Sequence, residues 1–88
     1  MSAYELRLAA SAERALARLP EFAAAAVVEF ITGPLLENPE RVGKRLSLEL
    51  EGYLSARRGA YRVIYRIADG AAVHVVRIDH RADVYRRR

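Results

Sequence analysis

The chain has 88 residues and no cysteine. A chain of this length buries only about 60–65% of its unfolded surface, so we expect one domain, residues 1–88, without a deep ligand pocket. The lack of cysteine excludes disulfides and thiolate metal sites and fits a reducing compartment, which predicts a cytoplasmic protein. The start of the chain lacks a signal-peptide pattern, and the longest apolar stretch, FAAAAVV, is far shorter than the roughly 20 residues that span a bilayer. We therefore expect no membrane partner.

Charge is unevenly distributed along the chain. Residues 1–40 contain three arginines and six glutamates, a net charge of −3, whereas residues 41–88 contain twelve basic and five acidic residues, a net charge of +7. Fourteen of the fifteen basic residues are arginine, whose planar fork of donors binds phosphate bidentately. This concentration favours a polyanion such as nucleic acid as the partner. A cationic surface that only keeps the protein soluble is the alternative.

The first half of the chain predicts a strand followed by a two-helix hairpin. Residues 4–8 alternate apolar and charged side chains, as a half-buried strand does. Ser11 is a plausible N-cap for a short helix, and residues 21–32 predict a second, alanine-rich helix that Gly33-Pro34 kinks or ends. The apolar face of the first helix consists of Ala12, Ala15, Leu16 and Leu19.

The second half predicts three strands of an antiparallel meander. Residues 38–46 carry turn residues and predict a loop. A weak strand signal follows at 53–57, and the strongest lies at 61–67, which is rich in β-branched and aromatic side chains. Residues 72–78 are its partner across an Asp69-Gly70 turn. The element order predicts an α+β domain whose helices pack on one sheet face.

The strand at 61–67 separates apolar from basic side chains. Strand alternation places Tyr61, Val63, Tyr65 and Ile67 on one face, and Arg62, Ile64 and Arg66 on the other. The second face is therefore expected to be open and cationic, a shape that suits a strand of nucleic acid.

Several segments of the chain, in this order, resemble toxins of the RelE/ParE superfamily. The segment NPERVGKRL, the string LEGYLSARRGAYRVIYRI and the terminal IDHRADVY carry the resemblance, which is closest to RelE-type toxins of actinobacteria. It implies a RelE-like fold and the toxin of a type II toxin–antitoxin system, a metal-independent endoribonuclease that cleaves messenger RNA on the ribosome. It also implies no cofactor and a hetero-oligomer with a RelB-like antitoxin. The alternatives are a ParE-like inhibitor of DNA gyrase and a toxin fold that only binds.

A metal-free ribonuclease must deprotonate the ribose 2′-OH, stabilise charge on the phosphoryl oxygens and protonate the leaving 5′-oxygen. Positioning and preorganised positive charge supply much of the rate. The resemblance implies that Arg62 clamps the scissile phosphate, that Arg81 stabilises transition-state charge, and that Tyr85 stacks on a base or orients the 2′-OH. The structural alternatives are an exposed strand arginine for Arg62 and a packed aromatic side chain for Tyr85.

The general base is the open question of this site. Some RelE toxins carry two lysines in the strand before the central one, where this chain has Tyr53 and Ser55. His80 is the candidate that fills the gap, since histidine can accept and donate protons near neutral pH. It can equally be a surface residue after a strand, and His74, in mid-strand, is expected to pack or be partly exposed.

Further basic residues are expected to form a rim that binds the RNA backbone without sequence specificity. Asp79 and Asp83 stand among arginines and are expected to pair with them rather than to bind two metal ions. The apolar helix surface over residues 22–36 exceeds what so small a sheet needs, so part of it is expected to bind the antitoxin. The residues of the rim are Arg41, Lys44, Arg45, Arg57 and Arg58.

Overall fold

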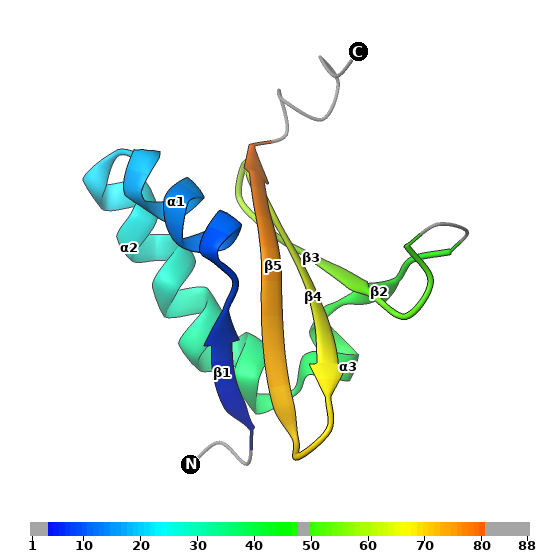
Figure 1. The fold of residues 1–88 in the computed structure, drawn as a ribbon. Helices are drawn as coiled ribbons and strands as arrows, with labels where there is room; N and C mark the ends of the chain where they lie inside the picture. The colour runs from blue at the N-terminus through cyan, green and yellow to red at the C-terminus, as the bar shows by residue number, and fades with distance from the viewer. Residues whose placement is uncertain (1–3, 48–49, 81–88) are drawn as a thin grey trace.

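The computed structural model describes residues 4–47 and 50–80. Within them, five strands form one sheet in the order β1-β5-β4-β3-β2, with β1 parallel to β5 and the other neighbours antiparallel (Figure 1). This arrangement confirms the predicted α+β fold. The elements are β1 (Glu5–Leu8), α1 (Ala10–Arg18), α2 (Glu21–Phe30), the π-helical turn η1 (Ile31–Leu35), α3 (Pro39–Val42), β2 (Lys44–Arg45), β3 (Leu54–Arg58), β4 (Tyr61–Ala68) and β5 (Ala72–His80).

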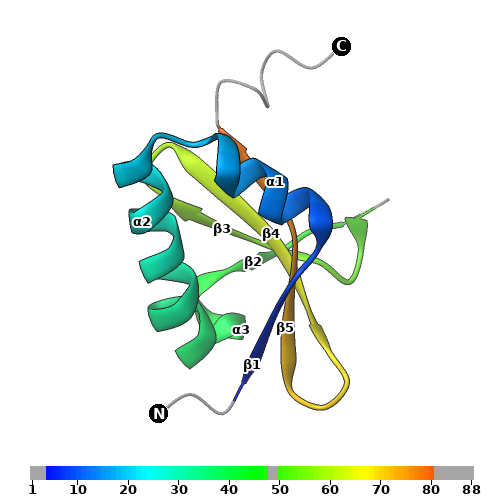
Figure 2. The ribbon, with the colours of Figure 1, turned by 60° about the vertical axis from the view of Figure 1, so that its left-hand side comes forward.

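Helices α1 and α2 lie together on one side of the sheet (Figures 1 and 2). The apolar face predicted for the first helix is confirmed. Ala12 is fully buried, and Ala15, Leu16 and Leu19 pack against the core. Within the described ranges, no helix is long and apolar enough to cross a membrane.

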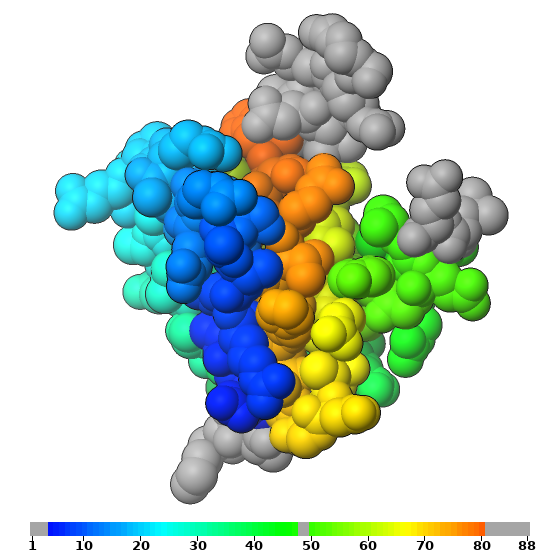
Figure 3. All heavy atoms as spheres, viewed as in Figure 1, coloured from blue at the N-terminus to red at the C-terminus, as the bar shows by residue number. Residues whose placement is uncertain are grey.

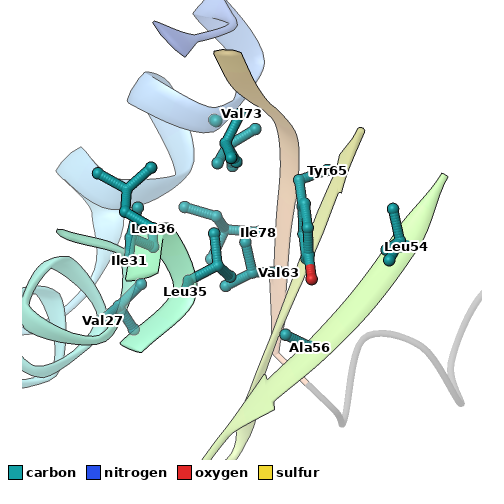
Figure 4. Packing of buried hydrophobic residues seen from close by; sticks show 12 residues of the cluster. Val27, Ile31, Leu35, Leu36, Leu54, Ala56, Val63, Tyr65, Val73 and Ile78 are labelled. Atoms are coloured by element: carbon teal, nitrogen blue, oxygen red, sulfur yellow. The ribbon is translucent and has the colours of Figure 1, made fainter. Parts of the chain in front are cut away.

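The core lies between this helical layer and one face of the sheet. Figure 4 shows Leu35 of η1 beside the strand residues Val63 and Ile78, and Ile31 and Leu36 belong to the same buried cluster. Burying an apolar side chain of this size contributes about 1.5–3 kcal/mol, so this cluster is the main source of stability. The buried residues that the strands contribute are Leu54, Ala56, Val63, Tyr65, Val73, Val75 and Ile78.

The predicted N-cap at Ser11 is wrong. The capping position is Ala9, and Ser11 lies inside the first turn of α1. The helix starts early because the backbone N–H of Ala9 donates to the carbonyl of Val75 in β5, over 2.9 Å. The hydroxyl of Ser11 is thereby brought to β5, where it donates to the carbonyl of Val76 over 2.6 Å.

The sequence predicts that Gly33-Pro34 kinks or ends the second helix, and the structure ends α2 at Phe30 and continues the chain as the π-helical turn η1. Pro34 lies inside η1, and it has no N–H with which to continue the α-helical hydrogen bonding. The helix widens into a π turn there and still delivers the buried side chains of Leu35 and Leu36 to the core.

The prediction of a continuous loop over residues 38–46 is wrong. Pro39 opens the short helix α3, since its fixed φ suits the first helical position. Lys44 and Arg45 then form the edge strand β2, opposite Ser55 and Leu54 of β3. The predicted strands at 53–57, 61–67 and 72–78 are confirmed with small shifts of their ends.

The pairing of β4 with β5 contains a β-bulge. Ile64 lies opposite Arg77 and Tyr65 opposite Val75, so Val76 has no residue opposite it. The extra residue changes the alternation of β5. Val73, Val75 and Ile78 are all in the core, and Arg77 and Asp79 therefore lie on the other face.

Candidate nucleic-acid interface

The sheet face opposite the helices carries most of the basic strand residues. In β4, the predicted alternation is confirmed: Val63 and Tyr65 are in the core, whereas Arg62 and Arg66 lie on the open face. Figure 3 shows the atoms of β5, in orange, at the surface between those of β1 and β4. We call this side of the sheet the open face.

A groove of about 570 Å³ lies on the open face, where β3 and β4 meet the segment that leads into β2. It brings together four of the predicted RNA-binding and catalytic residues, namely Lys44, Arg45, Arg57 and Arg62. A polar, cationic groove of this kind can hold phosphate groups from several sides. The lining residues are Val42, Lys44, Arg45, Leu46, Ser55, Arg57 and Arg62.

A tight turn sets the geometry of the groove floor. Strands β3 and β4 are joined by Gly59 and Ala60, and Gly59 has a φ of +62°, which the tight turns of hairpins require. The resulting register places Arg57 directly opposite Arg62. Like charges in this arrangement destabilise a sheet by up to about 1 kcal/mol. The pairing of Arg57 with Arg62 therefore lowers the stability of the fold.

The other neighbour of Arg62 does not neutralise this pair. Asp79 lies opposite Arg62 in β5, but its carboxylate accepts a hydrogen bond from Arg77 over 2.7 Å. The expectation that Asp79 pairs with an arginine is confirmed, and Asp83 lies outside the described residues. Among residues 4–47 and 50–80, no carboxylate is within ion-pairing distance of Arg57 or Arg62. The side chains that line the groove could therefore accept an anion.

The wall of the groove is anchored by Tyr65. Its hydroxyl donates to the carbonyl of Pro39 over 2.5 Å, and the residue is fully buried. Burial raises the pKa of Tyr65 to about 12. The Tyr65 hydroxyl fills the space beside Gly43, where a Cβ atom would overlap it. Gly43 and Tyr65 thus determine where the chain enters β2 and presents Lys44 to the groove.

Two predicted site residues lie on the opposite side of the sheet. Arg58 and His80 are both opposite Tyr61, whose side chain packs against the core. The rings of His80 and Tyr61 meet edge to face, with centroids 5.1 Å apart. His80 and Arg62 are thus at the same end of the sheet but on different faces. The predicted residues Arg81 and Tyr85 lie outside the described part of the chain.

Arg58 lines a second, largely apolar cleft of about 350 Å³. This cleft lies between α2 and the β3–β4 turn. Phe22, at its border, is 81% exposed, so part of the apolar helix surface is indeed left uncovered in this chain. Its lining residues are Pro20, Phe22, Ala23, Ala26, Val27, Arg58, Gly59, Ala60 and Tyr61.

Sequence reasoning did not assign a role to three further groups on the open face. Ser55 lines the groove; its hydroxyl can donate or accept a hydrogen bond but is not a base at neutral pH. Arg7 could have been found from the alternation in β1. Arg77 could not, because only the bulge at Val76 turns it to this face.

In the described part of the chain, no cluster of three or more histidine, aspartate or glutamate side chains could hold a metal ion.

Comparison with known proteins gives the family. The model of the ParE toxin of the type II toxin–antitoxin system parDE matches residues 6–85. Toxin RelG of Mycobacterium tuberculosis is 53% identical over 85 residues, covering 96% of this chain and 98% of the relative. Toxin RelE of the same organism is 54% identical over 84 residues, covering 94% and 87%. The chain therefore belongs to the ParE/RelE toxin family and is the toxin of a type II toxin–antitoxin system.

Solved structures agree with this assignment. The toxin–antitoxin complex RelBE2 from M. tuberculosis contains a chain that is 51% identical, with a TM-score of 0.86 and coverage of 94% of this chain and 97% of that one. The isolated RelE toxin of E. coli has a TM-score of 0.73 at 20% identity, covering 94% and 92%. At that identity, the likeness shows the RelE fold alone.

Proposed function

We propose that this toxin is a metal-independent endoribonuclease that binds messenger RNA on the open face and cleaves it on the ribosome. The observation that carries the proposal is the pair of Arg57 and Arg62, two like charges that face each other in a groove without a described counter-ion. A phosphate between them would relieve the repulsion and accept several charge-assisted hydrogen bonds. The relatives of more than 50% identity are toxins of the RelE type.

The proposed reaction uses the residues of the groove. Arg62 holds the scissile phosphate, and Arg57 and Lys44 bind the backbone on either side. The ribose 2′-oxygen attacks the phosphorus, the bond to the 5′-oxygen breaks, and the products are a 2′,3′-cyclic phosphate and a 5′-hydroxyl end. Arginine stays protonated, so Arg62 and Arg81 stabilise charge rather than transfer protons. Tyr85 orients the 2′-OH or stacks on a base.

His80 is the proposed proton carrier, which accepts the proton of the ribose 2′-OH and returns a proton to the leaving 5′-oxygen. It stands at the end of the sheet next to Arg62, although its ring lies on the Tyr61 side. His80 can therefore transfer protons to and from RNA in one of two ways. Either the RNA passes around the end of β5, or the His80 ring moves away from Tyr61 toward the open face. Ser55 lines the groove, and in this proposal its hydroxyl orients the attacking 2′-OH.

The partner in the resting state is a cognate, RelB-like antitoxin, with which the toxin forms a hetero-oligomer in the cytoplasm. Support comes from the RelBE2 structure, which is a toxin–antitoxin complex. The exposed Phe22 and the apolar cleft beside it are the surface that we assign to this partner.

The test is controlled expression in a bacterium with mapping of messenger RNA 5′ ends. Wild type is compared with Arg62→Ala, with Arg62→Ala/Arg81→Ala, and with Arg18→Ala, which removes an exposed arginine from α1 on the helical side. We expect new in-frame cleavages with 5′-hydroxyl ends in wild type and Arg18→Ala. They should fall by a factor of about 100–1,000 in Arg62→Ala, which lacks one preorganised donor.

Two other outcomes would replace the proposal. Growth arrest with intact messenger RNA and DNA damage signalling would assign the protein to the gyrase inhibitors. Expression without toxicity would leave a module that only binds. A parallel reaction with purified messenger RNA, with and without ribosomes, separates a ribosome-dependent nuclease from a free one.

A further inference from the structure

We infer that the open face has a second phosphate-binding subsite, formed by Arg7, His74 and Arg66. This inference rests on the proposed function and deepens it, because the subsite would hold the backbone of the same RNA strand away from the cleaved bond. The three residues come from β1, β5 and β4 and follow one another directly across the sheet. Arg7 lies opposite His74, and His74 lies opposite Arg66.

All three side chains lie on the open face. Their neighbours along the chain belong to the core or pack against it, and the side chains of a strand alternate between faces. Arg7 is exposed, and His74 and Arg66 are half-buried. The row is thus a shallow, accessible strip across three strands, which lie side by side in Figure 3. The neighbours in the core layer are Leu6, Leu8, Tyr65, Ile67, Val73 and Val75.

The charge of the row is largely available to a ligand. Arg7 comes within 3.6 Å of the Glu5 carboxylate, but both side chains are more than half exposed, so this ion pair is weak. Over residues 4–47 and 50–80, no carboxylate is within ion-pairing distance of Arg66. Arg7 and Arg66 are separated by two strand spacings, about 10 Å. Both guanidinium groups can therefore reach a phosphate above His74, whose ring supplies an N–H donor.

The row is in line with the groove. Arg66 follows Arg62 by four residues in β4, so their Cα atoms are about 13 Å apart on the same face. Between them lies Ile64, which is only 5% exposed and is flanked across the sheet by Ser55 and Arg77. A single strand of RNA lying along β4 would pass from the groove to the row over uncharged or cationic side chains.

The test is binding of 2′-O-methyl RNA, which cannot be cleaved by 2′-OH attack. Fluorescent oligonucleotides of two lengths are titrated, a trinucleotide that fills the groove and a longer one that also reaches the row. The variants are Arg66→Gln and His74→Leu, with Arg18→Gln on the helical side as the matched loss of one charge. Arg66→Gln is expected to lower the affinity for the longer RNA about three- to tenfold, and the salt slope of log K by about 0.7, one phosphate contact.

The comparison between oligonucleotides and variants decides the outcome. The inference is supported if Arg66→Gln and His74→Leu weaken the longer RNA more than the trinucleotide, and Arg18→Gln weakens neither. It is overturned if Arg66→Gln behaves like Arg18→Gln, or if both lengths lose affinity equally. It is also overturned if Arg66→Gln weakens only the antitoxin complex, which would make the row a protein-binding surface.

Failure of the proposed function looks different. If wild type neither binds these oligonucleotides nor cleaves messenger RNA, both the subsite and the nuclease are excluded. If wild type cleaves messenger RNA and Arg66→Gln binds the longer RNA as well as wild type does, only the subsite is excluded.

Discussion

The hydroxyl of Ser11 donates a hydrogen bond to the carbonyl oxygen of Val76, over 2.6 Å. Val76 is the bulge residue of β5, which has no residue opposite it in β4. The first turn of α1 thus supplies a partner at the position where β5 has an extra residue. Because the bulge is what turns Arg77 and Asp79 to the open face, this contact links the helical layer to the open face.

Ser11→Ala should lower the free energy of unfolding by about 1 kcal/mol, the net value of one hydrogen bond. For a domain of this size, such a change corresponds to a fall in Tm of about 4–8 °C. Thermal unfolding measures it, with Ser47→Ala as the control, since Ser47 is exposed and lies in a connecting segment. Equal Tm values for the two variants would show that the Ser11 contact adds nothing to stability.

Gly43→Ala should destabilise the protein by about 1–3 kcal/mol, the usual cost of overpacking, because the new methyl group would overlap the Tyr65 hydroxyl. The φ of Gly43 is −106°, which any residue can adopt, so the effect is steric. In a Tyr65→Phe background the overlap with the hydroxyl is gone, and Gly43→Ala should cost less. A double-mutant cycle by urea unfolding measures this coupling. Additive free energies would mean that Tyr65 does not limit position 43.

Tyr65 should make stability depend on alkaline pH. Tyrosine in the unfolded chain ionises near pH 10, whereas burial raises the pKa of Tyr65 in the folded protein to about 12. The folded state therefore keeps a proton that the unfolded state loses. This contribution is fully present below pH 10 and is lost as pH rises through about 12. It amounts to about 2–3 kcal/mol for a difference of two pKa units.

The measurement is the free energy of unfolding in urea from about pH 9 to about pH 12. Tyr65→Phe is the control, since it keeps the other tyrosines and removes only this group. We expect the pH-dependent loss of unfolding free energy to be smaller in Tyr65→Phe by about 2–3 kcal/mol. Parallel curves for wild type and Tyr65→Phe would contradict the assignment.

His80→Phe separates proton transfer from packing. Phenylalanine keeps a ring against Tyr61 but cannot carry a proton. If His80 is the proton carrier, the cleavage rate should fall by a factor of at least about 100 while RNA affinity and Tm stay near wild type. Cleavage at the wild-type rate would leave His80 as a packing residue and remove it from the mechanism.

Most of the fold could be predicted from the sequence because its signals are local. The alternation in β4 and the helical spacing from Ala12 to Leu19 each report one face of one element. The short elements α3 and β2 could not be predicted, because β2 is held by its pairing with β3 rather than by its own residues.

The site was predictable only in part, for a related reason. Arg57 and Arg62 could be placed near each other from the order of the strands, and the groove contains both, together with Lys44 from the segment that was predicted to be a loop. The side of the sheet on which His80 lies depends on the bulge at Val76. The bulge arises because Ile64 and Tyr65 of β4 pair with Arg77 and Val75 of β5 and skip Val76. Strict alternation has no means of registering one extra residue in a strand.

Arg57 and Arg58 form a natural matched pair for a test of RNA binding. They are adjacent in sequence and equal in charge, and both are exposed, but Arg57 lines the groove and Arg58 lines the apolar cleft on the other side. Arg57→Gln should weaken binding of single-stranded RNA several-fold and lower the salt slope of log K by about 0.7. Arg58→Gln should leave the salt slope close to that of wild type.

Arg57→Gln should weaken RNA binding but increase the stability of the protein. Arg57→Gln removes the repulsion with Arg62 and should raise the free energy of unfolding by about 0.2–1 kcal/mol. Salt-dependent RNA titration and urea unfolding on both variants test the two effects together. If the groove binds RNA, Arg57→Gln should be more stable than Arg58→Gln and should bind RNA more weakly than Arg58→Gln does. If Arg58→Gln weakens RNA binding as much as Arg57→Gln does, the RNA is not confined to the open face.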